Sequence, residues 1–182
     1  MPSKTTAEHK EKSPKSVRIA VVTISDSKYA YHWTGEKGVE TEDVSGKMIG
    51  SMTKKEGHEL MHYTIVPDHA GMILEAVDHI SSTYSPDAII TTGGTGLGPR
   101  DVTIETLEPL FDKVITGFGE IFRLESAKEI GHATMLSRAS AGLYNGVVIF
   151  CLPGSPHACK TGIKLILKEI RHIIKHTKER HL

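Results

Sequence analysis

Residues 88–103 read A-I-I-T-T-G-G-T-G-L-G-P-R-D-V-T, a short apolar run that leads into a glycine-rich segment. The run at residues 88–90 has the length and β-branched content of a buried strand. Glycine lacks a Cβ and tolerates positive φ, so the N–H groups of such a segment can converge on an anion. The residues whose N–H groups would do so are Gly93, Gly94, Thr95 and Gly96. We therefore predict a strand that ends in a phosphate-binding loop.

Two charged residues follow this loop, Arg100 and Asp101. A guanidinium can bind phosphate oxygens in bidentate geometry, and a carboxylate beside bound phosphates is a common Mg²⁺ ligand. The loop lacks the Gly-Lys-Ser/Thr ending of a P-loop and the G-x-G-x-x-G spacing of dinucleotide-binding folds. The alternative is an ordinary strand-to-helix turn in which Asp101 or Thr103 is the helix N-cap.

The composition is typical of one globular domain without net charge. The chain has 182 residues, 38% of them apolar, and Lys plus Arg equal Asp plus Glu at 22 each. This balance argues against nucleic acid or an anionic membrane surface as a partner. No apolar run approaches the roughly 18 residues that span a bilayer. Residues 1–16 lack the apolar segment of a secretory signal, so we expect a disordered tail on a cytoplasmic protein.

Apolar strands alternate with helical segments along the chain, which indicates an α/β domain with a mostly parallel central sheet. The further strands are expected at residues 17–24, 60–66, 113–116 and 147–152. Helices are expected at residues 44–55, after residue 69, at residues 103–110 and 117–130, and from residue 156 onward. Residues 29–37 show no period and are predicted to form a loop, and residues 142–146 a turn.

Polar residues follow the first two strands, at the positions where parallel sheets bind ligands. Ser25 follows the first strand, and Asp68 follows the second within Pro67-Asp68-His69. Asp43 precedes the helix at residues 44–55 as its N-cap, with Ser45 in the first turn. From its position alone, Asp68 is more simply the N-cap of the next helix than a ligand-binding residue.

The last strand is followed by Pro153, Gly154, Ser155 and Pro156. Serine followed by proline is the usual order of N-cap and first helical residue, and the free N–H groups beyond it form a natural anion site. The helix that follows has Ile163, Ile166 and Ile170 on one face and lysines on the other. We interpret that basic face as solvated. Cys151 and Cys159 are expected to be buried free thiols.

Several motifs in the same order resemble the MoaB/Mog family of molybdenum cofactor biosynthesis proteins, MoaB most closely. The first is T-T-G-G-T-G-x-x-x-R-D-V-T at residues 91–103. The others are F-D-K at residues 111–113, G-F-G-E at 117–120, L-S-R at 136–138 and L-P-G-S-P at 152–156. The resemblance covers about residues 17–167.

This resemblance implies a fold, an activity and roles for residues. The fold would be a three-layer αβα sandwich with a mostly parallel sheet, formed as a single domain by residues 17–178. The activity would be the adenylylation of molybdopterin by Mg-ATP, with release of pyrophosphate. Asp68 and Asp101 would be catalytic and would hold Mg²⁺. The glycine loop with Arg100 would bind ATP, and the pterin side would be held by Asp43, Ser45, Pro153, Gly154 and Ser155.

The resemblance also implies a homotrimer or homohexamer that supplies a molybdenum insertase. Three alternatives remain open. The first is a non-catalytic molybdopterin-binding or assembly protein of the same fold. The second is a nucleotide pyrophosphatase of the competence-damage type, whose loop resembles G-G-L-G-P-x-x-D-D, although Thr95 and Arg100 favour MoaB/Mog. The third is a generic structural oligomer. The eleven histidines are scattered and predict no transition-metal site.

Overall fold

A computed structural model describes residues 13–34 and 42–178. The strands are β1 (Arg18–Ile24), β2 (Glu59–Val66), β3 (Ala88–Thr92), β4 (Lys113–Val114), β5 (Ser140–Tyr144) and β6 (Val147–Leu152). The α-helices are α2 (Asp26–Thr34), α3 (Val44–Lys55), α4 (Ala70–Tyr84), α5 (Thr103–Leu107), α6 (Thr116–Ile130) and α7 (Pro156–Lys178). Two 3₁₀ helices, η1 (Glu108–Leu110) and η2 (Gly131–Leu136), complete the described part.

The six strands form one sheet in the order β2-β1-β3-β6-β5-β4. The four strands from β2 to β6 are parallel, and β5 and β4 extend the sheet in antiparallel pairs. The β-branched runs of β1, β3 and β6 form the centre of the sheet, where strands are buried on both faces. The predicted mostly parallel sheet is therefore confirmed.

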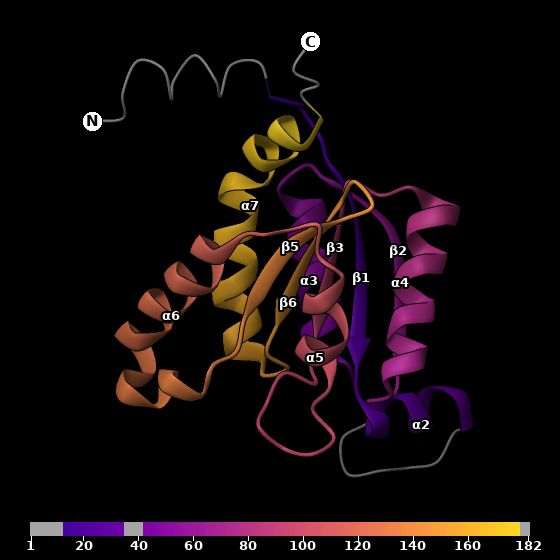
Figure 1. The fold of residues 1–182 in the computed structure, drawn as a ribbon, viewed down its shortest axis with the longest axis vertical. Helices are drawn as coiled ribbons and strands as arrows, with labels where there is room; N and C mark the ends of the chain where they lie inside the picture. Colours follow the sequence, from indigo (N-terminus) through magenta and orange to yellow (C-terminus); the bar gives the residue numbers. More distant parts are fainter. Residues whose placement is uncertain (1–12, 35–41, 179–182) are drawn as a thin grey trace.

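Helices cover both faces of the sheet, so the molecule has the three predicted layers (Figure 1). One apolar cluster joins alternate residues of the central strands to α3, α6 and α7, through Ile49, Phe122 and Ile163. The other joins the remaining strand residues to α4 and α5, through Ile73 and Leu107. The alternation follows from the two-residue period of strands, which sends successive side chains to opposite faces.

Two local predictions were wrong. Residues 29–34 belong to helix α2 rather than to a loop, and residues 35–37 lie outside the described residues. Most of the supposed turn at residues 142–146 is strand β5, which forms a hairpin with β6. The turn itself is Asn145-Gly146, where both residues have positive φ. This short strand, Ser-Ala-Gly-Leu-Tyr, has few β-branched residues and no clear period, so its pairing with β6 rather than its composition makes it a strand.

The carboxyl ends of β1, β3 and β6 lie at one level, because Thr23 pairs with Thr92 and Thr92 pairs with Leu152. The connection through α3 leads from β1 to β2, on one side of β1. The connection through α4 then leads from β2 to β3, on the other side of β1. Such a switch point leaves a crevice outside the strand ends, where open α/β sheets bind ligands. The loops that begin at Ser25, Gly93 and Pro153 meet there.

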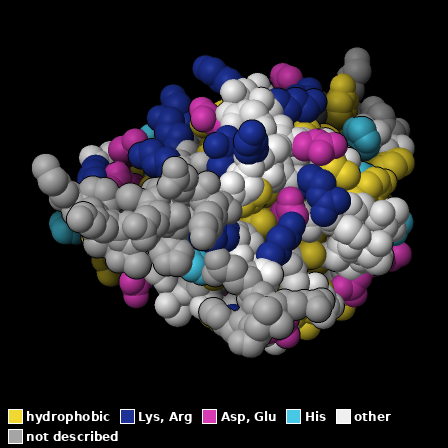
Figure 2. Space-filling model, turned by 90° about the horizontal axis from the view of Figure 1, so that it is seen from above, with side chains coloured by type: hydrophobic (Ala, Val, Ile, Leu, Met, Phe, Trp, Pro, Cys, Tyr) yellow, Lys and Arg dark blue, Asp and Glu magenta, His cyan; other side chains and the backbone are white. Residues whose placement is uncertain are grey.

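The opposite end of the molecule carries mixed charge. Figure 2 shows it from above, with basic side chains interrupted by acidic ones. On the basic face of α7, Lys160, Lys164 and Lys168 are exposed, which agrees with the interpretation of that face as solvated. Of the predicted tail at residues 1–16, only residues 13–16 are described, so disorder there stays a prediction. Across residues 13–34 and 42–178, none of the helices has the length and apolar composition that crossing a bilayer requires.

Candidate active site

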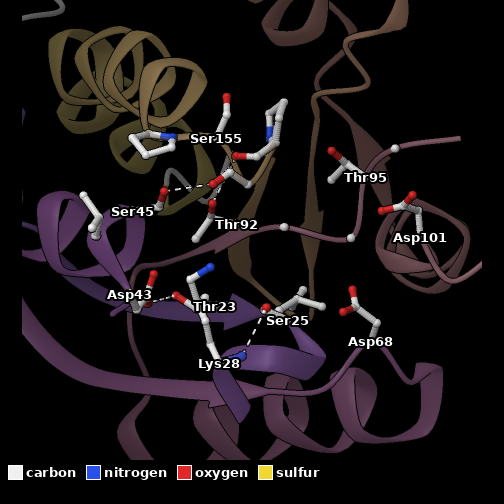
Figure 3. Close-up of a pocket in the computed structure, with 18 of the residues that line it drawn as sticks. Thr23, Ser25, Lys28, Asp43, Ser45, Asp68, Thr92, Thr95, Asp101 and Ser155 are labelled. Atoms are coloured by element: carbon white, nitrogen blue, oxygen red, sulfur yellow. Dashed lines mark hydrogen bonds between the residues drawn. The ribbon is translucent and has the colours of Figure 1, made fainter. Parts of the chain in front are cut away.

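A cavity of about 650 Å³ lies at the carboxyl ends of the parallel strands (Figure 3). Twelve of the thirteen predicted site residues line it. They are Ser25, Asp43, Ser45, Asp68, Gly93, Gly94, Thr95, Gly96, Asp101, Pro153, Gly154 and Ser155. Segments that are up to 130 residues apart in the chain thus contribute to one cavity. Asp68 and Asp101, the two predicted Mg²⁺ ligands, both line this cavity.

The glycine loop at residues 93–96 forms one wall of the cavity. Gly93 N donates to Leu152 O at 3.0 Å, which fixes the start of the loop to the end of β6. Gly93 and Gly94 have φ of +105° and +62°, values that glycine adopts at low cost. Within residues 13–34 and 42–178, the N–H groups of Gly94, Thr95 and Gly96 have no hydrogen-bond acceptor. They are available to an anionic ligand.

Asp68 and Asp101 lie on the same side of the cavity, next to this loop (Figure 3). Asp68 Oδ2 accepts from Asp26 N at 2.9 Å, and Asp101 Oδ2 accepts from Gly98 N at 3.0 Å. Each Oδ1 is left without a hydrogen-bond donor among the described residues. Burial, and then the negative charge of Asp101, raise the pKa of Asp68. Two neighbouring carboxylates with free oxygens form a donor set that suits Mg²⁺, which takes one or two protein carboxylates and otherwise keeps water.

Asp68 has a different local role from the predicted one, the N-cap of α4. The N-cap of α4 is His69, which makes no side-chain capping bond. Asp68 instead accepts from the first N–H of α2, while Asp68 N donates to Asp26 Oδ1 at 3.0 Å. This reciprocal pair joins the loop after β2 to the loop after β1. The N-cap interpretation for α4 was therefore wrong.

The cations of the site differ from the prediction. Arg100 is exposed, forms an ion pair with Asp26 and does not line the cavity. Lys28 and Arg138 line it instead. Arg138 binds Glu105 in a bidentate pair, with N···O distances of 2.6 and 3.1 Å.

The other end of the cavity is built around Asp43, which is buried (3% exposed). Its Oδ1 accepts from Gly46 N at 3.0 Å, which confirms the predicted N-cap of α3. Its Oδ2 accepts from both Thr23 Oγ1 and Tyr63 Oη at 2.5 Å. Burial and then the bond to Asp43 raise the pKa of Tyr63, so the phenol stays a donor. Three elements, β1, β2 and α3, are thereby joined at one carboxylate.

The loop at residues 153–155 closes this end of the cavity. Ser45 Oγ donates to Gly154 O at 2.8 Å, which connects α3 to the loop. Ser155 Oγ accepts from Ala158 N at 3.3 Å, as expected for the N-cap of α7. The Cα of Gly93 lies only 3.2 Å from the position of a Cβ on Gly154. The two predicted binding loops are therefore in contact.

Comparison with known proteins agrees with this geometry. Residues 20–172 match the family model described as "Probable molybdopterin binding domain". The chain belongs to the MoaB/Mog family. It is 45% identical over 165 residues to the "Probable molybdopterin adenylyltransferase" of Methanocaldococcus jannaschii, covering 91% of this chain and 96% of that protein. It is also 45% identical over 176 residues to the "Molybdopterin adenylyltransferase" of Pyrococcus furiosus, covering 94% and 98%.

The fold comparison leads to the same family. The crystal structure of the tungsten cofactor synthesizing protein MoaB from Pyrococcus furiosus superposes with a TM-score of 0.81 at 44% identity. The match covers 91% of this chain and 99% of that one. The MoaB/Mog resemblance noted from the motifs is thus confirmed over nearly the whole described chain.

Sequence reasoning missed several residues of this MoaB/Mog site. Lys28 lies just before the segment at residues 29–37 and received no role, although its position just after the polar residues of the first strand end was a usable signal. Arg138 was part of a quoted motif but received no role. Thr23 and Thr92 are the last hydroxyls of buried strands, and both line the cavity. Tyr63 gave no signal, because its contact with Asp43 depends on how β2 pairs with β1.

Proposed function

We propose that this chain transfers AMP from Mg-ATP to the terminal phosphate of molybdopterin and releases pyrophosphate. The supporting observation is a single cavity that combines the carboxylates of Asp68 and Asp101 with amides of the glycine loop that have no acceptor in the described part of the chain. The names of the relatives from M. jannaschii and P. furiosus specify the same activity for those proteins.

The reaction is a displacement at phosphorus. A phosphate oxygen of molybdopterin forms a bond to the α-phosphorus of ATP, and the bond from that phosphorus to the bridging oxygen of pyrophosphate breaks. A phosphate monoester is largely ionised near pH 7, so the attacking oxygen needs no strong general base. Positioning and charge neutralisation are then the main tasks of the protein. We assign Cys159 no role as a nucleophile, since its side chain is fully buried and this burial raises the pKa of its thiol.

The residues divide between two ends of the cavity. At one end, the amides of the glycine loop would bind the triphosphate, and Lys28 would add positive charge. Asp68 and Asp101 would hold Mg²⁺, which when bound neutralises phosphate charge. At the other end, Asp43 and Ser45 would help to hold the pterin, together with the loop at residues 153–155.

The substitution Asp101→Asn tests this proposal. Purified wild-type protein with Mg-ATP and molybdopterin should release pyrophosphate. Because the amide keeps the size but loses the charge, we expect kcat to fall by about 10²–10³-fold, the usual effect of removing one electrostatic group from a transition state. The Kd for molybdopterin should change by less than about threefold, since Asp101 would act at the nucleotide end of the cavity and the pterin would be held at the other end.

The control is Asp78→Asn, an exposed carboxylate on α4 that accepts from Tyr144 Oη. Asp78→Asn should leave kcat and the Kd for molybdopterin unchanged. Wild-type protein that binds molybdopterin without releasing pyrophosphate would be a non-catalytic binding protein. Hydrolysis of nucleotides without molybdopterin would instead favour the competence-damage type of activity.

We further expect a cytoplasmic homotrimer or homohexamer that delivers its product to a molybdenum insertase. Exposed apolar side chains on α6 and η2 support self-association. They include Ile121, Leu124, Met135 and Leu136, which are 52%, 67%, 80% and 64% exposed. Apolar surface of this kind commonly marks an interface between chains. Light scattering on the protein as it elutes from a size-exclusion column measures the number of chains in the oligomer.

A further inference from the structure

Three consecutive carbonyl groups of the glycine loop are anchored to the protein. Gly93 O accepts from Thr103 Oγ1 at 2.9 Å, and Gly94 O accepts from Thr103 N at 2.9 Å. Thr95 O accepts from Arg138 Nε, also at 2.9 Å. A buried threonine and one arginine thus hold three of the four carbonyl groups of this loop.

The anchors determine where the N–H groups point. In a trans peptide the carbonyl and the following N–H point in opposite directions, and every described peptide bond is trans. The N–H groups of Gly94, Thr95 and Gly96 therefore point away from the side on which the carbonyls are held. Thr103 is fully buried behind the loop, so the N–H groups that follow its two acceptors face the cavity.

The second loop repeats the arrangement. Pro153 O accepts from Thr92 Oγ1 and from Cys159 Sγ, both at 3.1 Å. Thr92 is 1% exposed and Cys159 is fully buried. The peptide that follows is fixed in the same way, so Gly154 N–H points away from these two anchors.

Gly154 O, in turn, accepts from Ser45 Oγ at 2.8 Å. The N–H of Ser155 therefore points away from Ser45. Neither Gly154 N nor Ser155 N has an acceptor within the described segments. The two loops together have five N–H groups without an acceptor among the described residues, and the hydroxyls of Thr103 and Thr92 are already bonded to loop carbonyls.

We propose that Thr103 and Thr92 are positioning residues, each of which uses a buried hydroxyl to hold a carbonyl and so turns the next N–H toward bound phosphate. Thr103 acts on the glycine loop and hence on the polyphosphate of the nucleotide. Thr92 acts on the loop at residues 153–155 and hence on the phosphate of the pterin. The assignment of the two ligands to the two loops rests on the proposed function, whereas the orientation of the amides does not.

The substitution Thr103→Val tests the first half, because valine keeps the shape and removes the hydroxyl. We expect KM for ATP to rise about tenfold, which corresponds to the loss of about one net hydrogen bond, with KM for molybdopterin unchanged. Binding of inorganic tripolyphosphate with Mg²⁺, followed by calorimetry, should weaken by the same factor. Thr103→Ser should restore wild-type values, since it keeps the donor.

The substitution Thr92→Val tests the second half and should give the opposite pattern. KM for molybdopterin should rise about tenfold while KM for ATP and tripolyphosphate affinity stay within twofold.

If Thr103→Val does not fold, Thr103→Ser and Thr103→Ala make the same comparison, because both lack the γ-methyl and only the serine keeps the hydroxyl.

Thr53→Val is the matched control. Thr53 is also fully buried, on α3, but its hydroxyl has no hydrogen-bond partner among the described residues. It should leave both KM values and the tripolyphosphate affinity unchanged.

The proposal is overturned if Thr103→Val and Thr92→Val lower only the melting temperature and leave every binding constant within twofold of wild type. Wild-type protein that releases no pyrophosphate but binds tripolyphosphate, with weaker binding in Thr103→Val, would refute the proposed function and support the positioning role. Adenylyl transfer that is insensitive to both threonine variants would do the reverse.

Discussion

Gly94 shows how closely the phosphate-binding loop is packed at the scale of one residue. Its φ is +62°, and a Cβ at this position would lie 2.4 Å from Thr103 Oγ1 and 2.9 Å from Asp68 Oδ1. Both atoms belong to residues with a proposed role, one in positioning and one in metal binding. The absence of a side chain at residue 94 therefore serves the geometry of the site as well as the backbone angle.

We predict that Gly94→Ala destabilises the protein by about 1–2 kcal/mol through backbone strain. It should also weaken tripolyphosphate binding by at least about tenfold, because Thr103 and Asp68 must move. Chemical denaturation and calorimetry measure the two effects. The matched control is Gly57→Ala, since Gly57 has φ of +78° and open space around its Cβ position. Gly57→Ala should lose stability through backbone strain alone and should keep normal ligand binding, because no neighbouring atom has to move. Equal loss of binding in both variants would contradict the argument.

At the scale of the element, strand β2 and helix α3 are coupled through one side chain. Tyr63 on β2 donates to Asp43, which caps α3 and also accepts from Thr23 on β1. A buried carboxylate is costly unless its oxygens are hydrogen-bonded. The cap of α3, and with it the position of Ser45, therefore depends on a tyrosine that does not line the cavity.

Tyr63→Phe should lower the free energy of unfolding by about 1–3 kcal/mol, because it removes a hydrogen bond to a charged group. Denaturant unfolding at pH 7 measures this. Tyr84→Phe is the control, since Tyr84 stacks on His62 but its hydroxyl has no hydrogen bond among the described residues. Equal stability of the two phenylalanine variants would show that Tyr63 does not support the cap.

At the scale of the whole molecule, Asp87 joins distant parts of the chain at the end opposite the cavity. Its Oδ2 accepts from Arg18 N at 2.7 Å, and its Oδ1 accepts from Lys178 Nζ near the end of α7. Burial alone would raise the pKa of Asp87, but the Arg18 N–H and Lys178 outweigh it, so the pKa lies below its usual value. A lowered folded-state pKa means that the contribution of Asp87 to stability is present above the unfolded-state value of about 4 and is lost as the pH falls below it.

We therefore expect wild-type stability to decrease below about pH 4 partly because Asp87 is protonated. Asp87→Asn should lower stability at pH 7 by about 1–3 kcal/mol and should make stability depend less on pH below pH 4. Unfolding by urea at pH 7, 5, 4 and 3 measures both. Lys178→Met should reproduce part of the effect, whereas Lys164→Met, on the exposed face of the same helix, should not. An unchanged pH profile in Asp87→Asn would refute the role of this carboxylate.

Much of the fold was predictable because the relevant signals are local. The β-branched runs of β1, β3 and β6 predicted a parallel sheet, and the isoleucine period of α7 predicted its buried face. The strand β5 and the helix α2 were missed, because pairing and packing with distant residues decide their structure more than their own composition does.

Some features of the site were likewise predictable from local sequence, whereas others depend on tertiary contacts. The sequence by itself determined the glycine loop, the helix starts at Asp43 and Ser155, and the polar residues at strand ends, since these depend on local backbone angles and on where apolar runs stop. Only the tertiary structure decided that Asp68 caps α2, that Arg100 faces Asp26 outside the cavity, and that Thr103 and Arg138 hold the loop carbonyls. Those contacts join residues 10 to 74 positions apart, and the order of strands in the sheet determines which such residues meet.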